Sequence, residues 1–362
     1  MTSASADSAL VYIGTYTQQL PHVNGTAEGV YVCRLDRATG ALERLGAASG
    51  VVNPSFVTLD AARRRLYAVQ EVGEYASQPG GAVSAFAIDE HSGALTLLNH
   101  QPTHGAHPCF ASVDASGRWL LVANYSGGNV TVLPLLGDGA LGAPATVVQH
   151  HGTPTHHDAP HPHAIVPDGA SDRVLVPDCG LDMIALYHLD DQSGALTPND
   201  PPRFALAGGA GPRHLAFHPA AALIYCINER NSTISALSYD AGAGALYALQ
   251  TLSTLPADFA GDNSCADIHV HPSGHFLYAS NRGHNSLACF AIGNDGLLTP
   301  RGHTPTQGST PRNFAIDPAG ALLLAANQDS GTVVTFRIDQ DTGALAPIAT
   351  AAIPSPVCVC IA

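Results

Sequence analysis

The chain contains no lysine, and all fifteen of its basic residues are arginine. A lysine amine is needed by Schiff-base enzymes and by P-loop nucleotide sites, so we expect neither kind of site. The GxSxG and HExxH motifs are also absent, which removes the usual marks of a serine-hydrolase elbow and of a zinc peptidase. Positive charge is scarce as well. The formal net charge is −14 with histidine neutral, which argues against nucleic acid as a partner.

Long apolar runs and paired cysteines are missing too. No apolar stretch approaches the roughly 20 residues that span a bilayer, so we expect no membrane partner. The first residues, MTSASADSA, have neither the basic region nor the apolar core of a secretory signal. The eight cysteines include no CxxC pair, which favours reduced, buried thiols. These absences predict a cytoplasmic protein.

What the sequence does contain is a repeat. Its first marker is Gly-Ala-Leu, once varied to Gly-Leu-Leu, where glycine supplies the positive φ of a hairpin turn. The marker recurs about every 50 residues, beginning at Gly40, Gly93, Gly139, Gly194, Gly244, Gly296 and Gly343. A second marker, such as NPSFVTLD from Asn53 or GPRHLAFH from Gly211, lies upstream of most of these turns. Four short strands per repeat of this length are typical of β-propeller blades.

The two ends of the chain predict how the ring closes. Residues 10–16, LVYIGTY, match the second strand of a blade that has no first strand before it. Residues 355–361, SPVCVCI, match a first strand that has no second strand after it. Joined, they complete one blade and remove an open sheet edge. We therefore predict an all-β fold: a seven-bladed β-propeller of four-stranded antiparallel blades, with residues 10–362 as one domain and 1–9 as a flexible tail.

One hairpin shows how the repeat brings polar residues together. Residues 213–217 and 223–228 read as two antiparallel strands joined by a turn at His218, so Arg213 and Glu229 should emerge at the same end.

In a propeller the first strand of each blade lines the central channel. The residues just after the marker proline, and those seventeen after it, should therefore ring one face near the axis. The first ring is Ser55, Cys109, His163, Arg213, Ala266, Arg312 and Val357, and the second is Tyr16, Glu71, Tyr125, Cys179, Glu229, Arg282 and Gln328.

Several of these residues carry a family resemblance. The motifs HPHAIVPD, GPRHLAFHP, INE, ADIHVHPSG and ASNRG resemble those of the lactonase-type seven-bladed propeller family, and the similarity runs from Leu10 to Ile361. That family includes bacterial 6-phosphogluconolactonases of the propeller type and fungal 3-carboxy-cis,cis-muconate cyclases. The resemblance implies an enzyme that needs no metal or organic cofactor. The active-site set that it implies is His163, Arg213, Glu229 and Arg282.

The resemblance also implies a small anionic lactone as substrate. The favoured expectation is a 6-phosphogluconolactonase, which opens 6-phospho-D-glucono-1,5-lactone to 6-phosphogluconate in the pentose phosphate pathway. The alternatives are another anionic lactone, a muconate-type cyclisation, and a non-catalytic propeller that serves as a scaffold for protein partners. The sequence does not separate phosphorylated from unphosphorylated lactones, and it gives no indication of oligomeric state.

The chemistry of the four residues is coherent with lactone opening. Arg213 and Arg282 would hold an anionic group, or stabilise the oxyanion that forms when the carbonyl is attacked. Either His163 or Glu229 could take a proton from the attacking water, and the sequence leaves that choice open. In the alternative interpretation, Arg213 and Glu229 form an ion pair that is only structural.

Arg312 and Asp267 complete the candidate substrate-binding residues. Arg312 occupies the same repeat position as Arg213, but it could instead be an ion-pair partner of Glu71. Asp267 could orient the site, or it could hold backbone together with His269 in the blade that lacks the marker proline.

The remaining histidines have simpler interpretations. The run between His150 and His163 invites a zinc interpretation, but its spacings fit no closed site and proline interrupts it repeatedly. We expect a loop beside the pocket and no native metal. His218 and His271 each precede proline in a turn, and we expect them to hydrogen-bond backbone there.

Overall fold

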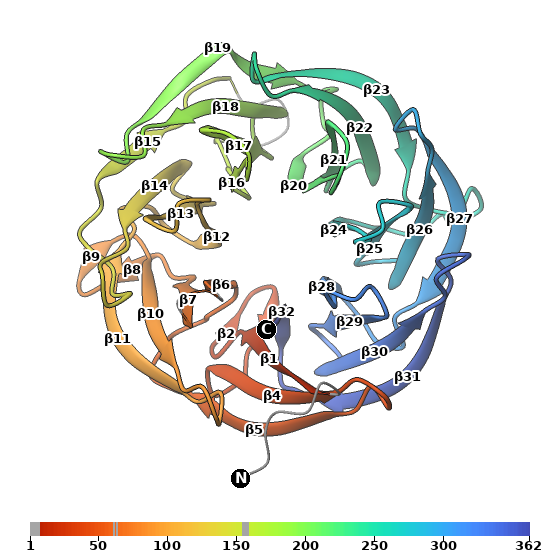
Figure 1. Ribbon diagram of the computed structural model, residues 1–362, viewed down its shortest axis with the longest axis horizontal. Coiled ribbons are helices and arrows are strands. Elements are labelled where there is room, and N and C mark those ends of the chain that lie inside the picture. Colours follow the sequence, from red (N-terminus) through yellow and green to blue (C-terminus); the bar gives the residue numbers. More distant parts are fainter. Residues whose placement is uncertain (1–7, 61, 63, 154–158) are drawn as a thin grey trace.

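Seven β-sheets surround a central channel in the computed structural model, which describes residues 8–60, 62, 64–153 and 159–362 (Figure 1). Within these residues each sheet has four antiparallel strands, and the sheets stand radially like the blades of a propeller. The predicted all-β architecture and blade number are therefore confirmed. None of the described segments is a helix long and apolar enough to cross a membrane.

The blades follow one another along the chain, with the innermost strand named first. The closing blade comprises β32 (Pro356–Ile361), β1 (Ser8–Thr15), β4 (Val30–Asp36) and β5 (Leu42–Ala48). The second comprises β6 (Val57–Asp60), β7 (Arg65–Gln70), β10 (Ala82–Ile88) and β11 (Leu95–Pro102), and the third β12 (Pro108–Val113), β13 (Trp119–Asn124), β14 (Asn129–Pro134) and β15 (Thr146–Gln149). The fourth comprises β16 (Val166–Pro167), β17 (Arg173–Asp178), β18 (Met183–Leu189) and β19 (Leu196–Ala205).

The other three blades are equally regular. The fifth comprises β20 (Pro212–Phe217), β21 (Leu223–Asn228), β22 (Thr233–Asp240) and β23 (Ala245–Ser253). The sixth comprises β24 (Cys265–Val270), β25 (Phe276–Asn281), β26 (Ser286–Ile292) and β27 (Leu298–Pro305), and the seventh β28 (Pro311–Ile316), β29 (Leu322–Asn327), β30 (Thr332–Ile338) and β31 (Leu345–Ala352).

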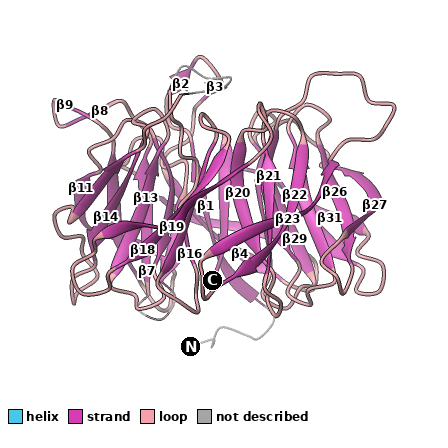
Figure 2. Ribbon diagram, turned by 90° about the horizontal axis from the view of Figure 1, so that it is seen from above, coloured by secondary structure: helices cyan, strands magenta, loops and turns pink. Residues whose placement is uncertain are grey.

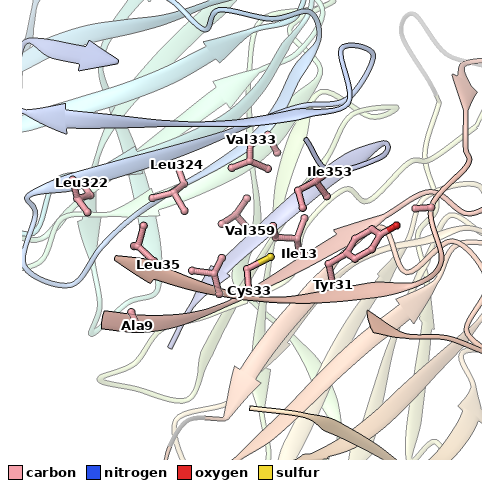
Figure 3. Packing of buried hydrophobic residues seen from close by; sticks show 13 residues of the cluster. Ala9, Ile13, Tyr31, Cys33, Leu35, Leu322, Leu324, Val333, Ile353 and Val359 are labelled. Carbon is pink, nitrogen blue, oxygen red and sulfur yellow. The ribbon is translucent and has the colours of Figure 1, made fainter. Parts of the chain in front are cut away.

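The ring closes as the two chain ends predict. Strand β32 pairs antiparallel with β1, with Val11 opposite Ile361 and Gly14 opposite Cys358. Figure 3 shows the apolar cluster that joins this closing blade to the seventh, in which Ile13 packs with Leu324 and other buried side chains of both blades. Closure therefore combines a hydrogen-bonded strand pair with a buried apolar interface between blades.

The glycine of each Gly-Ala-Leu marker makes the predicted hairpin turn. All seven have a φ between 63° and 85°, where residues with a Cβ are strained. Several of them also tie blades together. The hydroxyl of Tyr12 donates to the carbonyl of Gly93 in the next blade, and Tyr278 bonds Gly343 in the same way. The repeat thus fixes both the turn and the contact with the following blade.

The innermost strands carry a recurrent irregularity that matters for the site. In β20 the pairing with β21 shifts between Pro212 and His214, so that Arg213 is the bulged residue. The equivalent shift surrounds Cys109 in β12 and Arg312 in β28. A bulge re-aims side chains locally. It occurs at the position after the marker proline, which is the first ring of predicted channel residues.

The fourth blade departs from the expected pattern. Its marker, HPHAIVPD, reads as a full inner strand, but β16 has only two residues, and Pro162 contributes one isolated bridge to Asp178. Pro162 and Pro167 lack the N–H that a ladder needs, which accounts for the interruption. His163 is nevertheless held in place, because its backbone N–H donates to the carbonyl of Pro177 at 3.0 Å.

Two small hairpins stand on one face of the ring, beyond the repeat. They are β2–β3 (Gln19–Leu20 and Val23–Asn24) and β8–β9 (Glu74–Tyr75 and Gln78–Pro79). Figure 2 shows both hairpins on the same face, with the C-terminus toward the opposite face. The repeat pattern gave no sign of either hairpin.

Candidate active site

Three of the four candidate residues form one ionic cluster. Arg213 Nε lies 3.0 Å from Glu229 Oε2, and Arg282 Nη2 lies 3.1 Å from Glu229 Oε1. Glu229 directly follows β21 and Arg282 directly follows β25, so each emerges at the same end of its blade. The structure thus brings the predicted trio together, and it shows the Arg213–Glu229 pair that the alternative interpretation requires.

Backbone contacts fix the two guanidinium groups. Arg213 Nη1 donates to the carbonyl of Ala266, and Arg282 Nη2 donates to the carbonyl of Cys265 at 2.9 Å. Only 3% of the Arg213 side chain and 13% of the Arg282 side chain are exposed. Both cations are therefore held rigidly, with one carboxylate shared between them.

His163 lies in the same region but outside the ionic cluster. The residue is buried, and its ring meets those of Tyr125 and His214 edge-to-face, with centroids 5.5 and 5.2 Å away. Its Nδ1 lies 3.8 Å from the sulfur of Cys109. Among the described residues, Nε2 has no hydrogen-bond partner, so this nitrogen is available to a bound molecule.

The ionisation of Glu229 and His163 differs from that of the free side chains. Burial raises the pKa of Glu229, but Arg282, Arg213 and Arg312 outweigh it and lower the pKa to about 2. Burial, followed by Arg213 and His214, holds the pKa of His163 well below its ordinary value of 6.5. At neutral pH the site therefore contains an ionised carboxylate, a neutral imidazole and two guanidinium cations.

A cavity of about 500 Å³ opens onto these groups. Its volume lies within the range of roughly 300–1,000 Å³ that is typical of small-molecule sites. The residues that line it are Leu20, Pro21, His22, Glu71, His107, Cys109, Tyr125, Ser126, His163, Glu229, Arg282 and Arg312. Arg213 lies behind it, in a smaller recess that also contacts Arg312. Residues of both predicted rings therefore line this cavity or the recess behind it.

Another cavity of similar size has the wrong charge for an anionic ligand. Its volume is about 420 Å³, and its lining includes Asp114, Asp172, Asp190 and Asp191 with a single arginine, Arg173. An anion would meet four carboxylates there, which disfavours its binding. The cavity around Arg282 is the better candidate.

Arg312 lines the candidate cavity, but the predicted alternative pairing is wrong. Arg312 and Glu71 are both described, and they form no ion pair with each other. Glu71 instead accepts hydrogen bonds from Tyr16 at 2.9 Å and from Ser55. The Arg312 guanidinium carbon lies 5.7 Å from the centroid of the Tyr16 ring. The cation is thus directed toward the cavity without a carboxylate partner of its own.

Asp267 lies outside the cavity lining, which disagrees with its placement among the substrate contacts. Its two oxygens accept hydrogen bonds from the His214 ring at 2.8 Å and from the amide of Asn313, and His269 lies 3.0 Å away. His214 in turn lies 3.3 Å from Arg213 Nη1. Asp267 therefore reaches the site through the side chains that it holds, His214 and Asn313. This arrangement matches the other interpretation of Asp267, as a residue that orients the site.

Sequence reasoning missed three histidines. His214 follows Arg213 within the bulged strand, and burial followed by Arg213 lowers its pKa to about 4. His107 precedes a marker proline with a φ of 54°, and His22 belongs to the β2–β3 hairpin. The motif that contains Arg213 could have pointed to His214, since a bulge turns two successive side chains inward. No repeat signal identifies His22.

The histidine-rich run is only partly described. His150 Nδ1 lies 2.7 Å from Asp178, and His161 Nδ1 lies 2.9 Å from the carbonyl of Tyr125. Both imidazoles therefore have structural partners. His156, His157 and Asp158 lie outside the described residues.

Two other histidines, His218 and His271, accept hydrogen bonds from backbone N–H groups in their turns, as predicted.

The assembled groups are suited to an anionic, carbonyl-containing molecule. Guanidinium groups bind carboxylate and phosphate oxygens, and they stabilise negative charge that develops on an attacked carbonyl. A neutral imidazole with a free nitrogen can accept a proton from water. Glu229 is less suited to that task, because each of its two oxygens is held by a guanidinium group.

Comparisons with known proteins agree with this geometry. A family model described as "Lactonase, 7-bladed beta-propeller" matches residues 10–361. A 6-phosphogluconolactonase from Bacillus subtilis is 36% identical over 352 residues, which cover 96% of this chain and 97% of that protein. A crystal structure of a candidate 6-phosphogluconolactonase from Bacteroides fragilis superposes with a TM-score of 0.90, at 34% identity and over 100% of both chains. A periplasmic gluconolactonase from Pseudomonas aeruginosa also superposes with a TM-score of 0.90, at 30% identity, over 98% of this chain and 99% of the other.

Proposed function

Because this chain belongs to the lactonase family of seven-bladed β-propellers, we propose that it is a 6-phosphogluconolactonase. It adds water to the C1 carbonyl of 6-phospho-D-glucono-1,5-lactone, breaks the bond between C1 and the ring oxygen, and releases 6-phosphogluconate. The observation that carries the proposal is one cavity lined by a neutral imidazole and by the Glu229–Arg282 ion pair, with Arg213 bound to the same carboxylate directly behind it. This arrangement supplies a base and an oxyanion site for a carbonyl that is already reactive.

His163 acts as the general base in this proposal. Its free Nε2 takes a proton from the attacking water, and it returns that proton to the ring oxygen as the C1–O bond breaks. The lowered pKa keeps the imidazole neutral at physiological pH, so that it is ready to accept the proton. The open choice between His163 and Glu229 is thereby assigned to His163.

Arg282 and Arg213 provide the electrostatic part of catalysis. Arg282 lines the cavity and stabilises the negative oxygen of the tetrahedral intermediate, with Arg213 directly behind it. Glu229 holds both guanidinium groups in position and offsets part of their mutual repulsion. Asp267 supports Arg213 through His214, and Arg312 contacts the substrate from the wall of the same cavity.

The test of this proposal is hydrolysis of the phosphorylated lactone by the purified protein. 6-Phosphogluconate is measured by a coupled dehydrogenase, and the spontaneous rate is subtracted. The wild-type protein should accelerate ring opening, and His163→Gln should lower kcat by about 10²–10⁴-fold, the usual contribution of a general base. His91→Ala, which changes an exposed histidine in a distant turn, serves as the control.

Two results would contradict the proposal. A wild-type rate equal to the spontaneous rate would remove the enzymatic assignment. Full activity in the folded His163→Gln protein would remove His163 as the base.

The cytoplasm is the compartment that we propose for this activity. All eight cysteines of the chain lie within the described residues, and all are free thiols. Free thiols persist in a reducing compartment. Fractionation of the source cells should place the protein with cytoplasmic markers, whereas co-purification with periplasmic or secreted proteins would contradict this location.

A further inference from the structure

The cavity has two chemically different halves, because consecutive blades contribute to it in ring order. His163, Glu229 and Arg282 come from the fourth, fifth and sixth blades. The other half comes from the seventh, closing, second and third blades, together with the β2–β3 hairpin, which folds toward the channel beside β1 (Figure 1). A molecule that fills the cavity therefore touches both sets of groups.

Arg312 is the cation that defines the second half. Unlike Arg213 and Arg282, it has no ion pair and no hydrogen bond to any residue that the structure describes. Burial lowers its pKa, but Tyr16, Glu71 and Glu229 together raise it above the ordinary value, so Arg312 is charged at any physiological pH. Its guanidinium donors are thus available to an anion in the cavity.

His22 lies on the exposed hairpin next to Arg312. Its ring meets the Tyr16 ring edge-to-face at 5.4 Å, on the same tyrosine that Arg312 approaches. Burial, followed by Arg312, lowers the pKa of His22, so the ring is neutral at neutral pH and offers one N–H donor. His22 and Arg312 therefore present donors from two separate elements to one part of the cavity.

The β2–β3 hairpin is anchored to the seventh blade and to the wall of the channel. The Gln328 amide donates to the backbone carbonyl of His22 at 3.3 Å, and Gln328 follows β29 in the same blade as Arg312. Leu20 packs against the small apolar cluster of Tyr16, Val23 and Val357. These contacts hold the hairpin beside the seventh blade.

Glu71 is the one carboxylate in this half of the cavity. Tyr16 and Ser55 both donate hydroxyl hydrogen bonds to its Oε2, which ties the carboxylate to the wall of the channel. A carboxylate in this position is suited to accept a hydrogen bond from a sugar hydroxyl, and it would repel a phosphate that approached it directly. Phosphate is therefore directed toward Arg312 and His22 rather than toward Glu71.

We propose that Arg312 and His22 form a phosphate subsite in the part of the cavity contributed by the seventh and closing blades, next to the carbonyl-opening groups at Arg282, Glu229 and His163. This inference rests on the proposed lactonase function and fixes the orientation of the substrate within the same cavity. Arg282 and Arg213 share Glu229 and are matched to the single developing charge of an oxyanion. Arg312, which shares no carboxylate, is matched to the permanent charge of a phosphate.

The test compares two substrates, 6-phosphogluconolactone and unphosphorylated glucono-1,5-lactone, in the wild-type protein and in His22→Ala and Arg312→Gln. The ratio of their kcat/KM values should fall by about 10-fold in His22→Ala and about 100-fold in Arg312→Gln, chiefly through KM for the phosphorylated lactone. The inhibition constant of inorganic phosphate should rise in both variants. His91→Ala is again the matched histidine control.

The outcomes separate this inference from the proposed function. If the wild-type protein hydrolyses neither lactone, the proposed function itself fails. If it hydrolyses the phosphorylated lactone while both folded variants keep the wild-type ratio and phosphate inhibition constant, the subsite is overturned. Hydrolysis of the unphosphorylated lactone alone would also overturn it. Because His22 is exposed, His22→Ala keeps the test decisive even if Arg312→Gln lowers stability.

Discussion

Glu229 is the residue on which two guanidinium groups converge. With one oxygen near Arg213 and the other near Arg282, the carboxylate is ionised at any pH where the protein works. A carboxylate in this state organises cations better than it accepts protons. His163, neutral and outside the cluster, has the complementary property. The division of labour between these two residues is set by their surroundings, and residue type alone does not predict it.

The lowered pKa of His163 leads to a prediction about pH. The base must be unprotonated to work, and burial with Arg213 and His214 keeps it unprotonated to lower pH than a free imidazole. The acid limb of kcat should therefore have an apparent pKa well below 6.5. The measurement is kcat at saturating lactone between pH 4 and 8, with the spontaneous rate subtracted at each pH. An acid limb at or above 6.5 would exclude a buried, neutral His163 as the base.

The apolar interfaces between neighbouring blades stabilise the ring. Leu324 on β29 is fully buried in the cluster that joins the seventh blade to the closing blade (Figure 3). Leu97 on β11 is the same residue type, with 46% of its surface exposed. Because Leu324 and Leu97 are the same residue type, substituting each of them compares the effect of burial on stability at constant side-chain chemistry.

Leu324→Ala should lower the free energy of unfolding by about 2–5 kcal/mol, because it removes buried methyl groups and leaves a cavity. Leu97→Ala should change it by less than about 0.5 kcal/mol. Urea unfolding of the two variants beside the wild type measures the difference. Equal effects would mean that the interface between these two blades does not limit stability.

The sequence predicts regular elements better than irregular ones. The hairpin from Arg213 to Asn228 is predicted because alternation and turn residues mark each strand, and β20 begins only one residue earlier. The bulge at Arg213 is not predicted, since it depends on how Pro212 pairs with the neighbouring strand. The β2–β3 hairpin has two-residue strands, which are too short for any period to register. His22 was missed for that reason.

The whole molecule explains why a strongly acidic chain can attract an anion. Its formal net charge is −14, yet Arg213, Arg282 and Arg312 gather at one mouth of the channel, where the described carboxylates that line the cavity and its recess are Glu71 and Glu229. Ring closure produces this concentration, because residues far apart in sequence occupy equivalent positions in successive blades. The repeat period together with the complementary strands at the two chain ends was sufficient to predict that ring. Which side chains pair across it depends on distances that a sequence does not contain.

The most direct measurement of the central claim is a crystal structure of the protein with 6-phosphogluconate bound. The product should occupy the cavity of about 500 Å³, with its carboxylate at Arg282 and His163 and its phosphate at Arg312 and His22. Product bound in the acidic cavity near Asp114, or outside the channel mouth altogether, would contradict the account.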